Sequence, residues 1–220
     1  MENVFIIGAS GHAKVIIDII EKQNKYNIAG IIDNTTGSGE SLLGYPIIGK
    51  DEELSDLCTK YSVDAAVIAI GDNFQRQQVS NKIKSLRPDI AFIRAIHPTA
   101  TLGKNAAIAD GCIIMAGAII GADTCIGPGC IINNNSSIDH DSRMGEYSSL
   151  APNVTTGGLV TIGNISAIGI SATLSNNVKI GDHTVIGAGS LVLADIPANV
   201  IAYGTPAKII RPRNMNAPYL

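Results

Sequence analysis

The stretch IGADTCIGPGCII, residues 120–132, places an isoleucine at every sixth position and follows two of the three with glycine. A period of six fits neither an α-helix, which repeats every 3.6 residues, nor a simple strand, whose side chains alternate with a period of two. A chain that turns a corner every six residues does produce this period, because each turn then carries one inward aliphatic side chain. The stretch therefore predicts a repeated, coiled arrangement of short strands.

The same six-residue spacing continues far beyond this stretch without a slip in register. It covers sixteen positions, of which fifteen are aliphatic, and glycine follows directly in nine of the sixteen repeats. The residue two positions earlier is small or β-branched throughout, from Cys112 to Ser190. We expect the glycines to occupy corners that require a positive φ. The inward positions are Leu102, Ile108, Ile114, Ile120, Ile126, Ile132, Ile138, Met144, Leu150, Thr156, Ile162, Ile168, Leu174, Ile180, Ile186 and Val192.

This pattern resembles the hexapeptide-repeat, left-handed parallel β-helix family, and the resemblance covers residues 98–195. It implies that three repeats form one triangular coil of eighteen residues, which gives slightly over five coils here. Successive coils are expected to stack at the ordinary strand spacing of about 4.8 Å. Cys112 and Cys130 then lie one coil apart on the inner face, where they suit stacked buried thiols better than a catalytic pair.

The first 95 residues follow a different pattern, in which strand and helix signals alternate. Apolar runs predict strands, and apolar residues at helical spacing predict helices between them. Strand–helix alternation with apolar strands indicates a parallel sheet covered on both faces, as in a small Rossmann-like unit. The predicted fold class is thus α/β plus β, with domains at residues 1–96 and 97–220. The predicted strands are 4–8, 28–33, 65–71 and 90–96, and the predicted helices are 9–23, 51–61 and 74–86.

Composition narrows the cellular setting and the classes of partner. A net charge of -3 gives no electrostatic reason to expect nucleic-acid or membrane-surface binding. The first residues, MENVFIIGASGH, lack the basic start and cleavage site of a signal peptide, so we expect a cytoplasmic protein. The cysteines form no C-x-x-C pair, so neither a metal site nor a redox motif is expected. They are Cys58, Cys112, Cys125 and Cys130.

The motif IDHDSR, residues 138–143, stands out as a charged cluster within the repeats. The register directs Ile138 inward and places His140 at or just past a corner. Its neighbours one coil away, Ala122 and Gly158, are small and leave open space around the imidazole. A carboxylate beside an imidazole fixes its tautomer and raises its basicity, which favours a general base working near neutral pH. The alternative is a solvated corner histidine between two turn-forming aspartates.

Four segments, taken in order along the chain, identify a family. They are GASGHAKV at 8–15, IHPTATLG at 96–103, SSIDHD at 136–141 and GTPAKIIR at 204–211. Together they resemble the sugar acyltransferases that join a small Rossmann-like domain to a left-handed β-helix, and the match runs from about residue 3 to residue 211. The family includes acetyl-CoA-dependent N-acetyltransferases acting on nucleotide-linked 4-amino-4,6-dideoxysugars, and sialic acid O-acetyltransferases share its architecture.

The resemblance implies a chemical mechanism. The family's base is a histidine followed by an acidic residue, which corresponds to His140 and Asp141. His140 takes a proton from the sugar amine as it attacks the thioester of acetyl-CoA, in a direct transfer without an acyl-enzyme. A backbone N–H near Gly158 is expected to stabilise the oxyanion. Family members typically carry glutamate after the histidine, so the resemblance leaves open whether Asp139 or the shorter Asp141 orients the ring.

The resemblance also implies two binding sites and a homotrimer, with acetyl-CoA lying along the β-helix between neighbouring subunits. The first half is expected to hold the nucleotide sugar, since a glycine turn at a helix N-terminus lets the backbone approach a phosphate. Arg211 and Arg213 of the tail are further candidates for contacts with CoA phosphates. The implied substrate-binding residues are Ser10, Gly11, His12, Asp33, Asn34, Gly71, Asp72, Asn73 and Asn133, and the implied cofactor-binding residues are Ser149, Gly158, Ile170, Ala188 and Lys208.

Three other functions compete with a nucleotide-aminosugar N-acetyltransferase. An O-acetyltransferase acting on a sialic-acid-type sugar would use the same base on a hydroxyl group. An NAD-binding oxidoreductase is suggested by the glycine turn and Asp33, but the Rossmann-like half is under 100 residues and the remainder is repeat. A non-catalytic scaffold trimer would lose nothing when His140 is replaced.

Overall fold

The computed structural model describes residues 1–37, 39–214 and 217, and the chain divides into two compact units. The first unit comprises Met1–Gly71 and Gln75–Pro98. The second comprises Thr99–Leu220 together with the short segment Asp72–Phe74. The N-terminal α/β pattern and the hexapeptide repeats thus form separate bodies, apart from three residues at the start of one helix.

The first unit is built on a six-stranded sheet in the order β3-β4-β2-β1-β5-β6. All neighbours pair in parallel except β3 and β4, which form an antiparallel hairpin. The predicted Rossmann-like sheet is confirmed, and the hairpin is an addition that the sequence did not indicate. The elements are β1 (Glu2–Ile7), α1 (Gly11–Gln23), β2 (Tyr26–Ile32), β3 (Ser41–Leu42), β4 (Tyr45–Gly49), η1 (Asp51–Glu53), α2 (Leu54–Tyr61), β5 (Ala65–Ile68), α3 (Asn73–Leu86), β6 (Ala91–Phe92) and β7 (Ala95–Ile96).

Apolar side chains cover the strands of this sheet. Phe5 and Ile7 of β1 pack in one cluster with Leu54 of α2 and Ile83 of α3. Helix α1 buries its own apolar stripe, including Ile16, and lies along β2. The strands are apolar on both faces because helices supply covering side chains, as expected for a parallel sheet.

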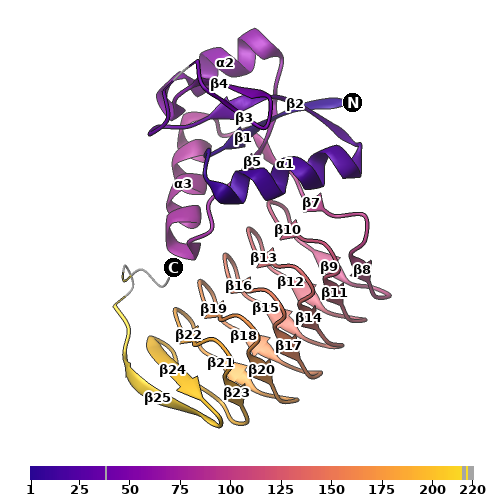
Figure 1. Cartoon of the computed structure of the whole chain (residues 1–220), viewed down its shortest axis with the longest axis vertical. Helices are drawn as coiled ribbons and strands as arrows, with labels where there is room; N and C mark the ends of the chain where they lie inside the picture. The colour runs from indigo at the N-terminus through magenta and orange to yellow at the C-terminus, as the bar shows by residue number, and fades with distance from the viewer. Residues whose placement is uncertain (38, 215–216, 218–220) are drawn as a thin grey trace. The chain divides into compact units, whose positions relative to one another are not determined.

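The second unit is a stack of triangular coils built from two-residue strands (Figure 1). We call its faces the first face (β8, β11, β14, β17, β20, β23), the second face (β9, β12, β15, β18, β21) and the third face (β10, β13, β16, β19, β22). The predicted left-handed β-helix is confirmed. The strands are β8 (Thr101–Leu102), β9 (Ala107–Ile108), β10 (Ile113–Ile114), β11 (Ile119–Ile120), β12 (Cys125–Ile126), β13 (Ile131–Ile132), β14 (Ser137–Ile138), β15 (Arg143–Met144), β16 (Ser149–Leu150), β17 (Thr155–Thr156), β18 (Thr161–Ile162), β19 (Ala167–Ile168), β20 (Thr173–Leu174), β21 (Lys179–Ile180), β22 (Val185–Ile186) and β23 (Leu191–Val192).

The strand register is the one that the six-residue pattern predicts. Ile120 pairs with Ile138 on the first face, and Ile126 pairs with Met144 on the second, each eighteen residues apart. Their side chains are at most 3% exposed, so they form the continuous core of the coils. Cys112 and Cys130 are fully buried one coil apart, and both thiols donate to backbone carbonyls.

The corners correct one prediction about glycine. At fifteen consecutive corners, the residue with positive φ is the third after the inward position, as at Asp123 and Asp141. The glycine directly after the inward position is needed for a different reason, which Gly121 illustrates. A Cβ atom on Gly121 would lie 2.5 Å from the backbone nitrogen of His140 in the next coil. Glycine therefore permits close stacking of the coils, and the left-handed position lies two residues later.

Buried hydroxyl and thiol groups bind successive coils together. Thr124 donates to the carbonyl of Asp139 at 2.8 Å, and Ser166 donates to that of Gly181 at 2.7 Å. Each of these bonds spans fifteen residues, so it reaches the corner of the next coil. They satisfy corner carbonyls that the short strands leave without ladder partners, which explains why serine, threonine or cysteine stands two positions before many of the inward residues.

A hairpin follows the last coil where the sequence predicted only a tail. Strand β24 (Val200–Gly204) pairs in parallel with β22, and β25 (Ala207–Pro212) pairs antiparallel with β24. The hairpin therefore extends the third face of the β-helix at its C-terminal end.

Candidate active site

The corner between β14 and β15 presents the DHD motif. Ile138 is fully buried, and the chain then leaves the first face through three exposed residues, Asp139, His140 and Asp141. Asp141 takes the left-handed conformation, with φ of 57°, and its N–H donates to the carbonyl of Ala122 at 3.0 Å. Aspartate is one of the few non-glycine residues that accept this conformation readily. The corner geometry therefore fixes where the His140 side chain begins.

Asp141 is the carboxylate that contacts the imidazole. Its Oδ2 lies 2.8 Å from Nδ1 of His140, whereas the Asp139 carboxylate accepts the backbone N–H of His140 at 2.7 Å. The two aspartates thus have different contacts, one with the ring and one with the backbone. Because Asp141 binds Nδ1, the neutral imidazole carries its proton there and presents Nε2 as the free acceptor.

The surroundings of His140 favour its protonated form. The hydrogen bond that the ring donates to Asp141, and then the negative charge of Asp139, raise the pKa of His140 above its ordinary value of 6.5. The side chains of His140 and Asp141 are each 53% exposed. The imidazole is accordingly accessible to a substrate while one edge of the ring is held by a carboxylate.

The imidazole packs against Gly158 of the following coil. A Cβ atom on Gly158 would lie 2.5 Å from Nε2 of His140 and 2.6 Å from Cε1, so a larger residue fits only if the ring moves away. Gly158 itself is buried. The open space that the sequence predicted around His140 is therefore filled on one side by the ring itself, which rests on the glycine backbone.

Thr156 supports this corner from inside, a role that is not among the predictions from the sequence. The N–H of Asp139 donates to its hydroxyl at 3.2 Å, and the hydroxyl donates to the carbonyl of Gly157 at 3.0 Å. A signal for it was present, because Thr156 is the one inward position of the sixteen that is not aliphatic.

The glycine turn of the first unit lies between β1 and α1. Ser10 is the N-cap residue of α1, and Gly11 and His12 form its first turn. Burial, and then the charge of Arg76, lower the pKa of His12 to about 4, so its imidazole is neutral at pH 7. Its Nε2 is buried, and the described part of the chain offers it no hydrogen-bond partner.

Asp33 holds the loop after β2 through four hydrogen bonds. Its Oδ2 accepts the N–H of Ala9 at 2.7 Å, and Oδ1 accepts both the N–H and the hydroxyl of Thr35 and the N–H of Thr36. Partial burial raises the pKa of Asp33, but these bonds outweigh it and lower the pKa to about 2. The side chain therefore joins the glycine turn to the loop after β2.

Asn34 is held just as firmly. Its Nδ2 donates to Oδ2 of Asp51 at 2.7 Å, and its Oδ1 accepts the N–H of Asp51 at 3.1 Å. Asp51 is 3% exposed and also pairs with Lys82 at 3.0 Å. The predicted binding residues Asp33 and Asn34 thus belong to a preorganised loop.

The IGDN turn at residues 70–73 contains three predicted substrate-binding residues, of which two are partly exposed and one is buried. Gly71 and Asp72 are partly exposed, and the buried Arg76 donates to the carbonyls of Ile70 and Gly71 at 3.0 and 2.8 Å. Asn73 is fully buried, and its Nδ2 donates to the carbonyl of Ser166 at 3.0 Å. Its side chain has no exposed surface for a ligand, so we remove Asn73 from the proposed substrate-binding set.

The β-helix residues that the family resemblance implies for substrate and cofactor binding lie along two different edges. Gly158 lies on the edge between the first and second faces, with His140. Asn133, Ile170 and Ala188 follow strands of the third face and lie on the edge between the third and first faces, and Ser149 lies in β16. Ile170 is 54% exposed and Ala188 is also exposed. Within one chain, therefore, the first face separates these two groups.

The C-terminal residues also divide. Lys208 and Arg211 of β25 are exposed. Arg213 is only 4% exposed, and its Nη1 donates to the carbonyl of His183 at 3.1 Å. Arg213 is therefore held against the β-helix, and the expectation that it meets a CoA phosphate is not supported.

Comparison with known proteins matches both halves of the chain. The family model of the PglD N-terminal domain matches residues 3–83, and that of the bacterial transferase hexapeptide (six repeats) matches residues 99–134. A crystal structure of GDP-perosamine N-acetyltransferase from Caulobacter crescentus is 34% identical, with a TM-score of 0.90. The similarity covers 96% of this chain and 98% of that one. The chain belongs to this family of hexapeptide-repeat sugar acyltransferases.

Two further family members are similar at lower coverage or identity. The acetyltransferase domain of PglB from Neisseria gonorrhoeae, solved with acetyl coenzyme A, is 28% identical over 95% of this chain and 99% of that one, with a TM-score of 0.86. UDP-N-acetylbacillosamine N-acetyltransferase of Bacillus subtilis (strain 168) is 35% identical over 116 residues, or 53% of this chain. That match spans 52% of the Bacillus protein. The Caulobacter structure was a histidine-to-alanine variant in complex with CoA and GDP-perosamine.

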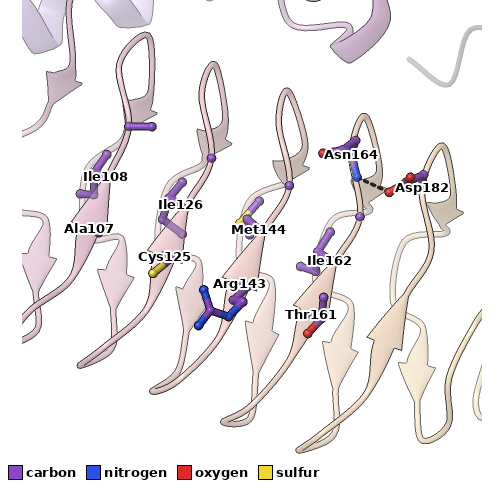
Figure 2. A pocket seen from close by; sticks show the side chains of 14 residues that line it. Ala107, Ile108, Cys125, Ile126, Arg143, Met144, Thr161, Ile162, Asn164 and Asp182 are labelled. Carbon is purple, nitrogen blue, oxygen red and sulfur yellow. Dashed lines mark hydrogen bonds between the residues drawn. The ribbon is translucent and has the colours of Figure 1, made fainter.

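In the present protein, one hollow on the β-helix lies apart from the candidate site (Figure 2). It follows the second face, past Cys125 and Arg143, to the edge with the third face, where Asn164 donates its N–H to Asp182 at 2.7 Å. None of the residues that line it belongs to the implied binding sets. The candidate site is therefore an exposed corner of the prism and not this hollow.

Two searches of the described residues complete the description. No helix among residues 1–37, 39–214 and 217 combines the length and apolar character needed to cross a membrane. The same residues contain no group of three or more histidine, cysteine or acidic side chains placed to hold a metal ion.

Proposed function

We propose that this protein transfers the acetyl group of acetyl-CoA to the 4-amino group of a nucleotide-linked 4-amino-4,6-dideoxyhexose. The observation that carries the proposal is the His140 corner, where a half-exposed imidazole is held by Asp141 at 2.8 Å and packs on Gly158. The chain that presents this corner is similar over 96% of its length to a GDP-perosamine N-acetyltransferase, which supports the choice of substrate class.

Nε2 of His140 is the general base in the proposed reaction. The amine nitrogen attacks the thioester carbonyl carbon and forms the C–N bond, while Nε2 takes a proton from the nitrogen. The tetrahedral intermediate then collapses with cleavage of the C–S bond, and the proton on the imidazole can pass to the departing thiolate. The products are the N-acetylated sugar nucleotide and free CoA, so no acyl-enzyme is required.

Asp141 and Gly158 assist this step in different ways. The Asp141 carboxylate holds the Nδ1 proton and stabilises the imidazolium that forms, as an acidic partner does for other histidine bases. The ring packs on Gly158, and we propose that the backbone N–H of this residue binds the oxyanion that develops on the thioester oxygen. The base and the proposed oxyanion donor then belong to adjacent coils, and neighbouring coils stack about 4.8 Å apart.

The first unit is proposed to hold the nucleotide sugar. The N-terminus of α1, with Ser10, Gly11 and His12, offers backbone donors and a helix dipole suited to a diphosphate. Asp33 and Asn34 shape the adjoining loop, because their side-chain bonds leave it little freedom. Gly71 and Asp72 complete the proposed set.

We infer a homotrimer that shares its sites between subunits. Support comes from the two edges, since Gly158 lies on one while Ile170 and Ala188 lie on another, beyond the first face. Acetyl-CoA can meet both groups if the edge of one subunit faces the other edge of its neighbour. The four cysteines are free thiols, which supports the expected cytoplasmic location. The product is expected to serve polysaccharide biosynthesis.

A substrate panel tests the proposal. Purified protein is incubated with acetyl-CoA and, separately, with UDP-, GDP- and dTDP-linked 4-amino-4,6-dideoxyhexoses or CMP-sialic acid, and CoA release and product mass are followed. Acetylation of at least one aminosugar is the expected result. Acetylation of CMP-sialic acid alone would replace the proposal by O-acetyl transfer, and turnover of none of the aminosugars would contradict it.

A further inference from the structure

Thr156 interrupts the inward row of the β-helix at the coil that follows His140. It lies one coil after Ile138 and pairs with Leu174 of the next coil, and both of these neighbours are aliphatic. Thr156 is only 4% exposed. An aliphatic residue would fill this position as it does the other fifteen, so packing of the core does not explain a hydroxyl group here.

The hydroxyl group links two segments of the candidate site. It accepts the N–H of Asp139 at 3.2 Å and donates to the carbonyl of Gly157 at 3.0 Å. Asp139 in turn accepts the backbone N–H of His140 at 2.7 Å through its carboxylate. One buried hydroxyl therefore connects the segment that carries the base with the segment that lies beneath its ring.

The bond to Gly157 also sets the direction of the Gly158 N–H. The carbonyl of Gly157 and the N–H of Gly158 belong to one planar peptide unit and point in opposite directions when the bond is trans. A donor that holds the carbonyl on the Thr156 side thus turns the N–H away from Thr156. Glycine at 157 and 158 has wide conformational freedom, so without this bond the peptide orientation would be weakly determined.

Other buried hydroxyls of the β-helix make different contacts. Thr124 and Ser142 donate to the carbonyls of Asp139 and His140, at 2.8 and 3.3 Å, so they hold the His140 corner without reaching the Gly157 peptide. Thr184 donates to the carbonyl of Pro197 at 2.8 Å, and Ser166 donates to that of Gly181 at 2.7 Å, in both cases joining one coil to the next corner. These residues lie two positions before the inward row. Thr156 lies in the row itself, and its two partners, Asp139 and Gly157, directly precede His140 and Gly158 in the sequence.

We propose that Thr156 is a positioning residue that aligns the base and the oxyanion donor with each other. Its hydroxyl fixes Asp139, and through Asp139 the backbone of His140. The same hydroxyl fixes the Gly157–Gly158 peptide, whose N–H is the proposed donor to the developing oxyanion. The inference rests on the proposed acetyl transfer, but the relation between Thr156 and the His140 corner can also be measured without turnover.

Three variants test the inference by steady-state kinetics with acetyl-CoA and the best aminosugar. Thr156→Val removes the hydroxyl and keeps the branched shape, and Thr156→Ser keeps the hydroxyl. Thr184→Val removes an equally buried hydroxyl from a later coil. We expect kcat of Thr156→Val to fall about tenfold or more, since misplacement by about 1 Å can cost a hundredfold. Both KM values should change less than threefold, and Thr156→Ser and Thr184→Val should keep kcat within threefold of wild type.

Titration of the His140 imidazole by proton NMR gives a readout independent of activity. Loss of alignment weakens the contact with Asp141, so the His140 pKa should fall toward 6.5 in Thr156→Val and stay at the wild-type value in Thr156→Ser. A Thr156→Val variant with wild-type kcat and an unchanged titration would overturn the inference, as would a Thr156→Ser variant impaired as strongly as Thr156→Val. A wild-type protein that acetylates no aminosugar instead refutes the proposed function, and the titration then still decides the role of Thr156.

Discussion

Replacing Gly158 with alanine tests whether contact between this residue and the imidazole supports the reaction. A Cβ atom at this position would lie 2.5 Å from Nε2, 2.6 Å from Cε1 and 3.0 Å from Cδ2 of His140. Ordinary contact between such atoms needs about 3.5 Å, so the ring must withdraw by about 1 Å. The side chain is half exposed and can move without disturbing the core, so the fold should tolerate the change.

The cost should therefore appear in the rate and not in stability. Displacement of a reacting group by about 1 Å can cost about a hundredfold, and it also disturbs the 2.8 Å contact with Asp141. We expect kcat of Gly158→Ala to fall by about 30- to 100-fold. Tm should stay within a few degrees of wild type, since replacing glycine by alanine also reduces the entropy of the unfolded chain.

A double-mutant cycle decides whether the loss acts through His140. Kinetics are measured for wild type, Gly158→Ala, His140→Ala and the double variant at saturating acetyl-CoA and aminosugar. If the methyl group acts by displacing the ring, it costs little once the ring is absent, and the two losses are strongly non-additive. Additive losses, or a wild-type rate for Gly158→Ala, would refute this account of the contact.

Three further predictions concern the pH dependence of the reaction, the Asp33 loop and the sharing of sites between subunits. A general base works only when deprotonated, so kcat/KM should fall as the pH drops below the raised pKa of His140, with a midpoint above 6.5. In Asp141→Asn this midpoint should move to lower pH, because the hydrogen bond to Asp141 is the largest cause of the raised His140 pKa. Asp33→Ala should lower the free energy of unfolding by about 1–3 kcal/mol in urea titrations at pH 7. Because the folded pKa of Asp33, about 2, lies below its ordinary value of 3.8, its contribution to stability is present above pH 3.8 and is lost as the pH falls toward 2. Equal stability of both proteins at pH 7 would refute this prediction. Mixing His140→Ala subunits with Ala188→Glu subunits under exchange conditions should restore activity if sites are shared between subunits, and no restoration in verified mixed trimers would contradict sharing.

Much of the β-helix could be predicted because its period is strict. The inward row from Leu102 to Val192 defines every short strand of the coils, and this regularity also places His140 on an outer corner. The role of the glycines was harder to predict, because a positive φ and a close approach of the next coil both favour glycine. At Gly121 the structure shows close approach to the next coil, whereas the left-handed residue is Asp123.

The remaining differences arise from contacts that no spacing encodes. Whether Asp139 or Asp141 meets the imidazole depends on the left-handed backbone at Asp141, which directs that carboxylate to the ring. The IGDN turn resembles that of the family and predicts a substrate contact for Asn73, yet the amide of this residue is buried against the Ser166 carbonyl. The hairpin β3–β4 was missed because its first strand has only two residues and buries neither side chain.

The activity of His140→Ala tests the central claim most directly. Its kcat is compared with that of wild type at saturating acetyl-CoA and the preferred nucleotide-linked 4-aminosugar, at a pH above the midpoint of the wild-type profile. General-base catalysis typically contributes about 10²–10⁴-fold, so we predict a fall in this range with an unchanged Tm, because the side chain is 53% exposed. A variant that retains wild-type kcat would contradict the assignment of the base and of the corner as the active site.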